Sequence, residues 1–162
     1  MSEGTVTTPQ ARSSATADNP GMLAWRTFLA AHATIIRALE AELEADQDLA
    51  LSDFDVLAQL QLAGGTLRMR DLADRVLLSR SGLTRRIDRL ESAGYVERTA
   101  CETDRRGSYA RLTDAGGDRL TKALPIHLRG IEQHFIAPLD AEELAAIGAT
   151  LAKVVPADQR PG

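Results

Sequence analysis

The sequence predicts a mainly α-helical protein with one small β-hairpin. Apolar residues recur at spacings of three and four along most of the chain, which is the period of an α-helix. Polar residues suited to helix N-caps and glycines suited to helix C-termini punctuate this pattern. A single pair of short segments, 95–98 and 109–112, departs from the helical period and predicts the hairpin.

The length of 162 residues favours a single domain. Residues 1–19 are rich in small and polar side chains and nearly lack large apolar ones, so we expect a disordered tail before one domain at 20–162. The sequence shows no signal-peptide pattern and no apolar run long enough to span a bilayer. We therefore expect a cytoplasmic protein that does not associate with a membrane.

The first predicted helix covers residues 21–46, where apolar side chains form one long stripe. Ser52 is suited to cap a second helix, because its hydroxyl can accept a bond from a free backbone N–H and acidic residues follow it. We expect this helix at 53–62, with Gly64 and Gly65 ending it.

A helix–turn–helix is predicted at 69–94. A short helix at 69–76 is joined by a brief turn to a second helix, which Ser79 is expected to cap and Gly94 to end. The inward face of the second helix carries Leu83, Ile87 and Leu90.

The predicted hairpin follows directly and has a long polar tip. Thr113 is then suited to cap a helix from 114 to about 134. We expect that helix to bend at Pro125, because proline removes a backbone donor. Pro138 interrupts the chain, and a final helix is expected at 141–154.

The charges are divided unevenly along the chain. The formal net charge is −4, yet residues 66–111 hold 11 arginines and 7 acidic residues, a net of +4. The remainder carries −8. Arginine forms bidentate contacts with phosphate and with guanine, so this basic segment predicts a nucleic-acid partner. A general preference for arginine accounts for the near absence of lysine, but it does not account for the clustering.

Seven residues form the predicted contact set for double-stranded DNA. Small polar residues and arginines lie on the helix face opposite Leu83, where they can reach base edges in the major groove. Arginines at the hairpin tip can enter the adjacent minor groove, and an acidic neighbour can orient one of them. The alternatives are a solvated helix with an exposed turn, or a winged-helix module that binds proteins. The predicted set is Arg80, Ser81, Thr84, Arg85, Asp104, Arg105 and Arg106.

The chain resembles the MarR family of winged helix–turn–helix repressors. The resemblance rests on the segments 51–57, 72–73, 79–91, 94–98, 104–106 and 112–116. It implies a transcriptional repressor whose winged helix–turn–helix, at about 50–113, reads a palindromic operator as a homodimer. It also implies that the helices at 21–46 and 114–154 interlock between subunits. In the family's pattern, Asp104 orients Arg106 in the minor groove.

Within the family, the chain is most similar to the urate-responsive type. That resemblance implies a small aromatic, phenolic or urate-like effector bound by Trp25, Asp55, Arg86 and Arg98. An aromatic ring can stack on a planar ligand, and arginine can neutralise an anion. The alternatives are a core tryptophan, a helix-start aspartate, and arginines that are structural or face DNA.

Other chemistry is weakly supported. The lone Cys101 has no partner for an internal disulfide, so we expect an inert exposed thiol. Three scattered histidines, His32, His127 and His134, lack the clustering of a zinc site. A redox- or metal-responsive regulator is the corresponding alternative. No phosphate loop or catalytic motif is present, so we expect neither an enzyme nor a cofactor.

Overall fold

The computed structural model describes residues 19–76, 78–100 and 108–157. The chain divides into two compact units, residues 1–37 and 38–162. The long helix α2 (Pro20–Gln47) begins in the first unit and ends in the second, which confirms the helix predicted at 21–46. The predicted tail lies outside the described residues except for Asn19.

The second unit is helical around one small sheet, which confirms the predicted fold class. After α2 its elements are α3 (Leu51–Leu62), β1 (Thr66–Arg68), α4 (Met69–Arg75), α5 (Arg80–Ser92), β2 (Val96–Ala100), β3 (Ser108–Leu112), α6 (Asp114–Ile131), η1 (Glu132–Ile136) and α7 (Ala141–Leu151). Among the described residues, no helix combines the length and the apolar character needed to cross a membrane.

Local capping explains where several helices begin. The Ser79 hydroxyl accepts a hydrogen bond from the N–H of Gly82 at 3.1 Å, so its predicted cap of α5 is confirmed. The predicted role of Ser52 is wrong. Helix α3 already begins at Leu51, and Ala50 occupies the N-cap position without a side-chain bond. Ser52 therefore lies inside the first turn, where it cannot cap.

Helix α6 begins as predicted and ends differently. The Thr113 hydroxyl accepts from the N–H of Gly116 at 3.0 Å, which confirms the predicted cap. The helix changes to the π-helical turn η1 after Ile131, so the regular α-helix ends before His134. Pro125 lies inside α6, and the bend expected there stays a prediction.

The sheet has one more strand than the predicted hairpin. Its order is β1-β3-β2, and both pairings are antiparallel. Strand β1 pairs Leu67 with Ala110 on β3. Three residues are too few to show the alternation that identifies a strand, so this element was not predicted. We call the hairpin of β2 and β3 the wing.

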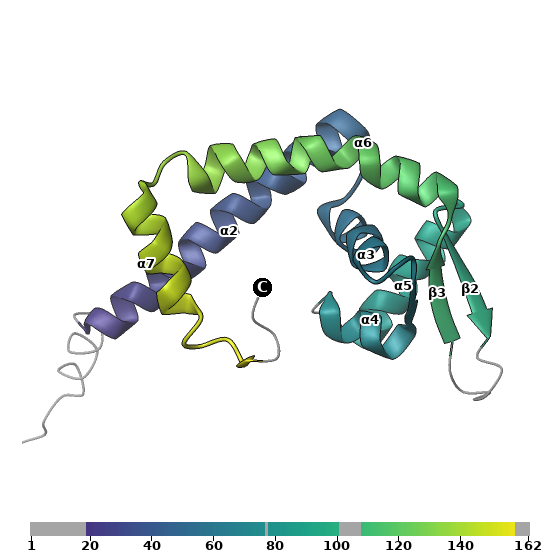
Figure 1. Cartoon of the computed structure of the whole chain (residues 1–162), viewed down its shortest axis with the longest axis horizontal. Coiled ribbons are helices and arrows are strands. Elements are labelled where there is room, and N and C mark those ends of the chain that lie inside the picture. Colours follow the sequence, from purple (N-terminus) through teal and green to yellow (C-terminus); the bar gives the residue numbers. More distant parts are fainter. Residues whose placement is uncertain (1–18, 77, 101–107, 158–162) are drawn as a thin grey trace, which may run out of the picture. The chain divides into compact units, whose positions relative to one another are not determined.

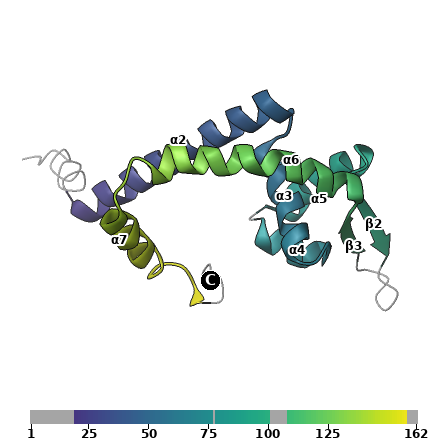
Figure 2. The same ribbon diagram turned by 45° about the horizontal axis from the view of Figure 1, so that its top comes forward.

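The core of the second unit joins the helices to the sheet. Figure 1 shows α3, α4, α5 and the strands gathered beside the first turns of α6. Figure 2 shows the wing extending away from those same turns. The fully buried side chains with the largest volumes are Leu43, Leu57, Leu60, Leu72, Leu83, Ile87, Leu90, Val56 and Val96. This core fixes α5 and the wing on one compact support.

Candidate nucleic-acid interface

Helix α5 has one buried face and one exposed face. Leu83, Ile87 and Leu90 are at most 2% exposed, as the sequence predicted. Ser81, Thr84, Arg85 and Asp88 are exposed. The helix can therefore present short polar side chains and a guanidinium group to a partner while its apolar face stays in the core.

The structure brings together three members of the predicted DNA-contact set. Ser81, Thr84 and Arg85 all belong to the exposed part of α5. Among the described residues, Arg85 forms no ion pair. The other predicted contacts at the hairpin tip lie outside the described residues, as does Cys101; they are Asp104, Arg105 and Arg106. Arg80 begins α5, but its side chain is not among the described parts of the chain.

Guanidinium groups surround a shallow recess of about 260 Å³ on α5. Its lining residues are Leu78, Gly82, Arg85, Arg86 and Arg89. Two of the arginines are neutralised in part by an aspartate, whereas Arg85 has no such partner within the described residues. The recess is therefore positively charged and suited to an anion such as a phosphate or a carboxylate.

The aspartate that holds the other two arginines is Asp53, at the start of α3. It is 6% exposed. Arg86 Nη1 lies 3.3 Å from Asp53 Oδ1, and Arg89 Nη2 lies 2.6 Å from Oδ2. Sequence reasoning treated Asp53 only as a helix-start charge and missed this role. The contact joins residues more than 30 positions apart, so no local pattern indicates it.

Arg98 ties the wing to α5. From strand β2 it donates to a carboxylate oxygen of Asp88 and, at 3.1 Å, to the carbonyl oxygen of Thr84. Its backbone N–H donates to Glu91 Oε1 at 3.2 Å. Of the four predicted effector contacts, Arg86 and Arg98 are thus both engaged by carboxylates of the protein itself.

Asp55 and His127 form a half-buried pair between α3 and α6. Burial raises the pKa of Asp55, and a hydrogen bond with Gln59 and the charge of His127 oppose that rise. Burial lowers the pKa of His127, and the charge of Asp55 opposes that fall. The centre of the His127 ring lies 4.4 Å from that of the Phe54 ring, and the buried Nδ1 of His127 has no hydrogen-bond partner among the residues that the structure describes.

The fourth predicted effector contact, Trp25, belongs to the first unit. It is 53% exposed, and its ring centroid lies 6.1 Å from that of Phe28 in a stacked arrangement. Phe28 in turn lies 6.3 Å from the ring of His32. These three rings form an exposed aromatic row on α2.

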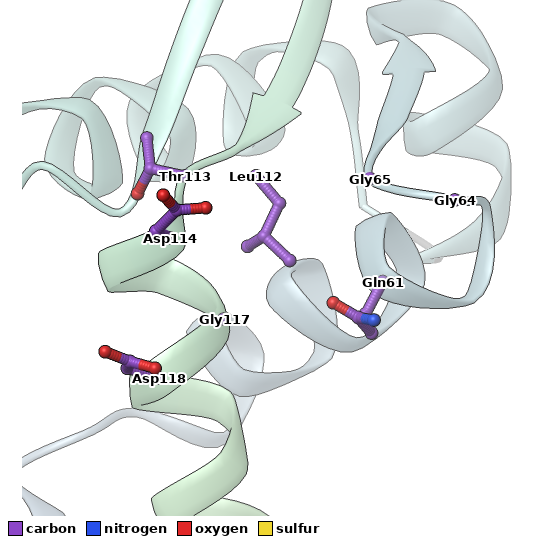
Figure 3. A pocket seen from close by; sticks show the side chains of 8 residues that line it. All are labelled: Gln61, Gly64, Gly65, Leu112, Thr113, Asp114, Gly117 and Asp118. Carbon is purple, nitrogen blue, oxygen red and sulfur yellow. The ribbon is translucent and has the colours of Figure 1, made fainter.

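A second recess, of about 560 Å³, has a different chemical character. It lies between the end of α3 and the start of α6, where Asp114 and Asp118 carry its charge (Figure 3). The other lining residues are Gln61, Gly64, Gly65, Leu112, Thr113 and Gly117. Its negative charge makes it unsuited to nucleic acid. Within the described residues, no group of three or more side chains is placed to hold a metal ion.

Known proteins of similar sequence and structure are transcriptional regulators. The MarR family model matches residues 47–107. The chain is 32% identical over 108 residues to the HTH-type transcriptional regulator PecS of Dickeya dadantii. This match covers 65% of the chain and 64% of PecS, so the chain spans slightly less than two thirds of that relative.

Two solved structures from Streptomyces coelicolor match over most of their length. The MarR family transcriptional regulator AbsC is 35% identical, with a TM-score of 0.76, and the match covers 82% of this chain and 90% of AbsC. Sco3205, a MarR family transcriptional regulator solved in complex with DNA, is 29% identical, with a TM-score of 0.77. That match covers 86% of this chain and 94% of Sco3205.

Proposed function

The chain belongs to the MarR family of transcriptional regulators, and on this premise we propose that it is a dimeric, sequence-specific DNA-binding repressor released by a small molecule. The observation that carries the proposal is the exposed face of α5, where Arg85 stands beside Ser81 and Thr84 without an ion pair among the described residues. A helix of this kind can lie in the major groove, with arginine reaching phosphate or guanine. The relative Sco3205 was solved in complex with DNA.

The wing supplies the second part of the proposed interface. Arg98 holds strand β2 of the wing against α5. We assign Arg105 or Arg106 to the minor groove and Asp104 to orienting one of these arginines, as the sequence predicted. Arg80 completes the proposed contacts at the start of α5.

The proposed dimer forms through helices outside the winged helix–turn–helix. Large apolar side chains are exposed on α2, α6, η1 and α7, and contiguous exposed apolar surface commonly marks a protein interface. They include Leu23, Trp25, Phe28, Leu29, Leu124, Leu128, Ile136 and Leu151. Covering these side chains with a second copy places two α5 helices on a palindromic operator. In this organisation the DNA-binding part is about 50–113, between the helices at 21–46 and 114–154.

We assign effector binding to Trp25, Asp55, Arg86 and Arg98, with an aromatic, phenolic or urate-like anion as the ligand. Arg86 and Arg98 are only 27% and 31% exposed, and each already binds a carboxylate. An anionic effector would compete with those carboxylates. Loss of the Arg86–Asp53 bond would remove one of the two contacts that hold Asp53 of α3 against α5, and loss of the Arg98–Asp88 bond would remove one of the contacts that hold the wing against α5. Either change weakens the fit to DNA.

The test of DNA binding is a titration of the full chain with its own upstream DNA at several salt concentrations. We expect affinity to fall as salt rises, because arginines displace counterions from phosphates. Arg85→Ala should weaken binding and reduce the slope of log affinity against log salt by about 0.9 for each phosphate that is no longer neutralised. Arg129→Ala, on α6, removes an equal charge far along the sequence and should leave the slope unchanged. Salt-independent or absent binding by the unaltered chain would contradict the proposal.

The effector is tested by adding urate, salicylate or zinc to the complex with DNA. We expect urate or salicylate to release the DNA and zinc to have no effect. Trp25→Ala should abolish release while leaving DNA affinity near that of the unaltered chain. If release persists in both Trp25→Ala and Arg98→Ala, the proposed effector site is wrong.

A further inference from the structure

Arg119, on α6, closes the end of helix α2. Its guanidinium group donates to the backbone carbonyl of Gln47 and, at 3.2 Å, to that of Asp48. It also donates to Gln47 Oε1 at 3.3 Å. The last carbonyl groups of a helix lack partners within the helix and carry its negative dipole end, so a cation there is favoured. Asp48 has φ = 49°, the left-handed conformation that ends a helix.

The same guanidinium group lies over Tyr95, at the corner where α5 leads into the wing. The Arg119 Cζ atom is 6.0 Å from the centre of the Tyr95 ring. The Tyr95 N–H donates to the carbonyl of Leu90 at 2.9 Å and so closes the end of α5. The next residue, Val96, begins β2. Tyr95 is therefore the point at which the directions of α5 and the wing are set.

We infer that Arg119 is a positioning residue that sets the angle of the wing relative to the end of α2. Arg119 belongs to α6, and its guanidinium group links that helix to two other elements. It binds the α2 terminus by hydrogen bonds and the α5–β2 corner by its contact with Tyr95. Within the described part of the chain, its buried Nε atom has no hydrogen-bond partner. The orientation of the guanidinium group therefore follows from the carbonyls on one side and the ring on the other.

The α6 backbone already holds the corner, and Arg119 adds the link to α2. The Thr113 N–H donates to the Tyr95 carbonyl at 3.1 Å, and the Thr113 hydroxyl donates to the Gly94 carbonyl at 2.7 Å. These bonds join the corner to α6 alone. Because Arg119 contacts both the α2 terminus and Tyr95, a movement of the α2 terminus would move Tyr95. A movement of the proposed dimer helices would therefore change the orientation of the wing.

A second arginine on α6 offers a matched control. Arg129 Nη2 lies 3.0 Å from Asp46 Oδ2, so it joins the same two helices as Arg119. It lies ten residues further along α6 from the turn that faces Tyr95. Arg119→Gln and Arg129→Gln thus each remove one link between α6 and the α2 terminus, and they differ in whether the α5–β2 corner is affected as well.

The experiment compares these variants in the salt titration with the chain's own upstream DNA, and it rests on the proposed function. Arg119→Gln should weaken binding about tenfold and lower the salt slope by about 2, because each wing of the dimer no longer reaches about one phosphate. Arg129→Gln should keep the slope of the unaltered chain. A merely destabilised protein has a smaller active fraction and keeps its slope, so the slope separates positioning from stability.

Tyr95→Leu provides an independent variant that leaves the end of α2 capped. It should lower the slope as Arg119→Gln does, and the double variant should be no worse than either single variant. If Arg119→Gln does not fold, the salt slope of Tyr95→Leu tests the inference by itself. Unchanged slopes in the variants, with salt-dependent binding by the unaltered chain, would overturn the inference alone. Absence of binding by the unaltered chain would instead overturn the proposed function.

Discussion

Single charged residues determine how the proposed DNA-binding face is held. Asp53 is buried and neutralised by Arg86 and Arg89, whereas Arg85, which precedes Arg86 on α5, forms no ion pair with the described residues. Arg98 of the wing binds Asp88 of α5, but that carboxylate is exposed. Buried carboxylates with two guanidinium partners stabilise a fixed geometry, because removing either side leaves a charge unpaired.

The contribution of Asp53 is measurable by Asp53→Asn. We expect a loss of about 2 kcal/mol in the free energy of unfolding, because bonds between charged groups contribute about 1.5–3 kcal/mol each. Urea denaturation at a fixed protein concentration measures it. Asp71→Asn is the control, since Asp71 pairs with Arg70 in an exposed position and should change stability by less than about 0.5 kcal/mol. Equal stabilities of the two variants would contradict the role given to Asp53.

His127 makes folding stability depend on pH. Burial lowers its pKa in the folded chain from 6.5, so the unfolded chain takes up a proton first as pH falls. Its contribution is therefore complete above pH 6.5 and is lost as pH falls toward the folded-state pKa. Asp55 acts at lower pH with the opposite sign. Because burial raises its folded-state pKa from 3.8, its contribution to stability is complete below pH 3.8 and is lost as pH rises through the folded-state pKa.

His127→Phe should reduce the loss of stability on acidification while keeping a ring against Phe54. The slope that one titrating proton contributes is at most about 1.4 kcal/mol per pH unit. Urea unfolding at about pH 5.5 and about pH 7.5, the window set by the histidine, gives the comparison. A pH dependence unchanged in His127→Phe would exclude His127 as its source.

At the scale of elements, the start of α6 organises the junction between the wing and α5. Thr113 caps α6 and also binds the Gly94 carbonyl. The α6 backbone at Gly116 approaches Tyr95 so closely that a Cβ atom there would lie 2.1 Å from the Tyr95 carbonyl oxygen. Glycine at this position is therefore required by a close approach between two elements.

Two adjacent glycines allow this requirement to be tested. Gly116→Ala should destabilise the fold by about 3 kcal/mol, because the first turn of α6 must move away from Tyr95. Gly117→Ala places its Cβ in open space and should stabilise the helix by roughly 0.5–1 kcal/mol. Thermal unfolding of both variants measures the contrast. Similar effects of the two substitutions would show that the approach at Gly116 is not tight.

For the whole molecule, the decisive feature is apolar surface outside the core. Leu124 and Leu128 are 42% and 54% exposed and lie one turn apart on α6. Such side chains are tolerated singly, but a row of them indicates an interface. The proposed operator reading by two α5 helices depends on that interface, since one copy contacts a single half-site.

Leu128→Glu should weaken the proposed dimer. Burying an unpaired carboxylate opposes association, so we expect the dimer dissociation constant to rise at least about tenfold, which corresponds to about 1.4 kcal/mol. Sedimentation equilibrium measures this constant. Leu62→Glu is the control, because Leu62 is 77% exposed at the end of α3 and lies outside the proposed interface. Equal dimer dissociation constants for Leu128→Glu and Leu62→Glu would show that Leu128 does not belong to the dimer interface.

Features that depend on near neighbours in the chain were predictable. The helical period located α2, α4 and α5, and the hydroxyls of Ser79 and Thr113 cap the helices they were expected to cap. Gly94, with φ = 77°, ends α5 as expected. The exposed face of α5 follows from the same periodicity. The sequence resemblance also indicated the family to which the chain belongs.

Contacts between distant segments were decided only by the folded chain. Strand β1 exists because β3 pairs with it, and Ser52 fails as a cap because α3 begins earlier, after the buried Leu49. The contacts of Asp53 with Arg86 and of Arg119 with Tyr95 cross tens of residues. Periodicity and capping act within one or two helical turns, whereas such partners are chosen by packing. Sequence patterns therefore determine most of the helices and the hairpin, whereas tertiary packing determines the added strand β1 and which charged side chains pair with one another.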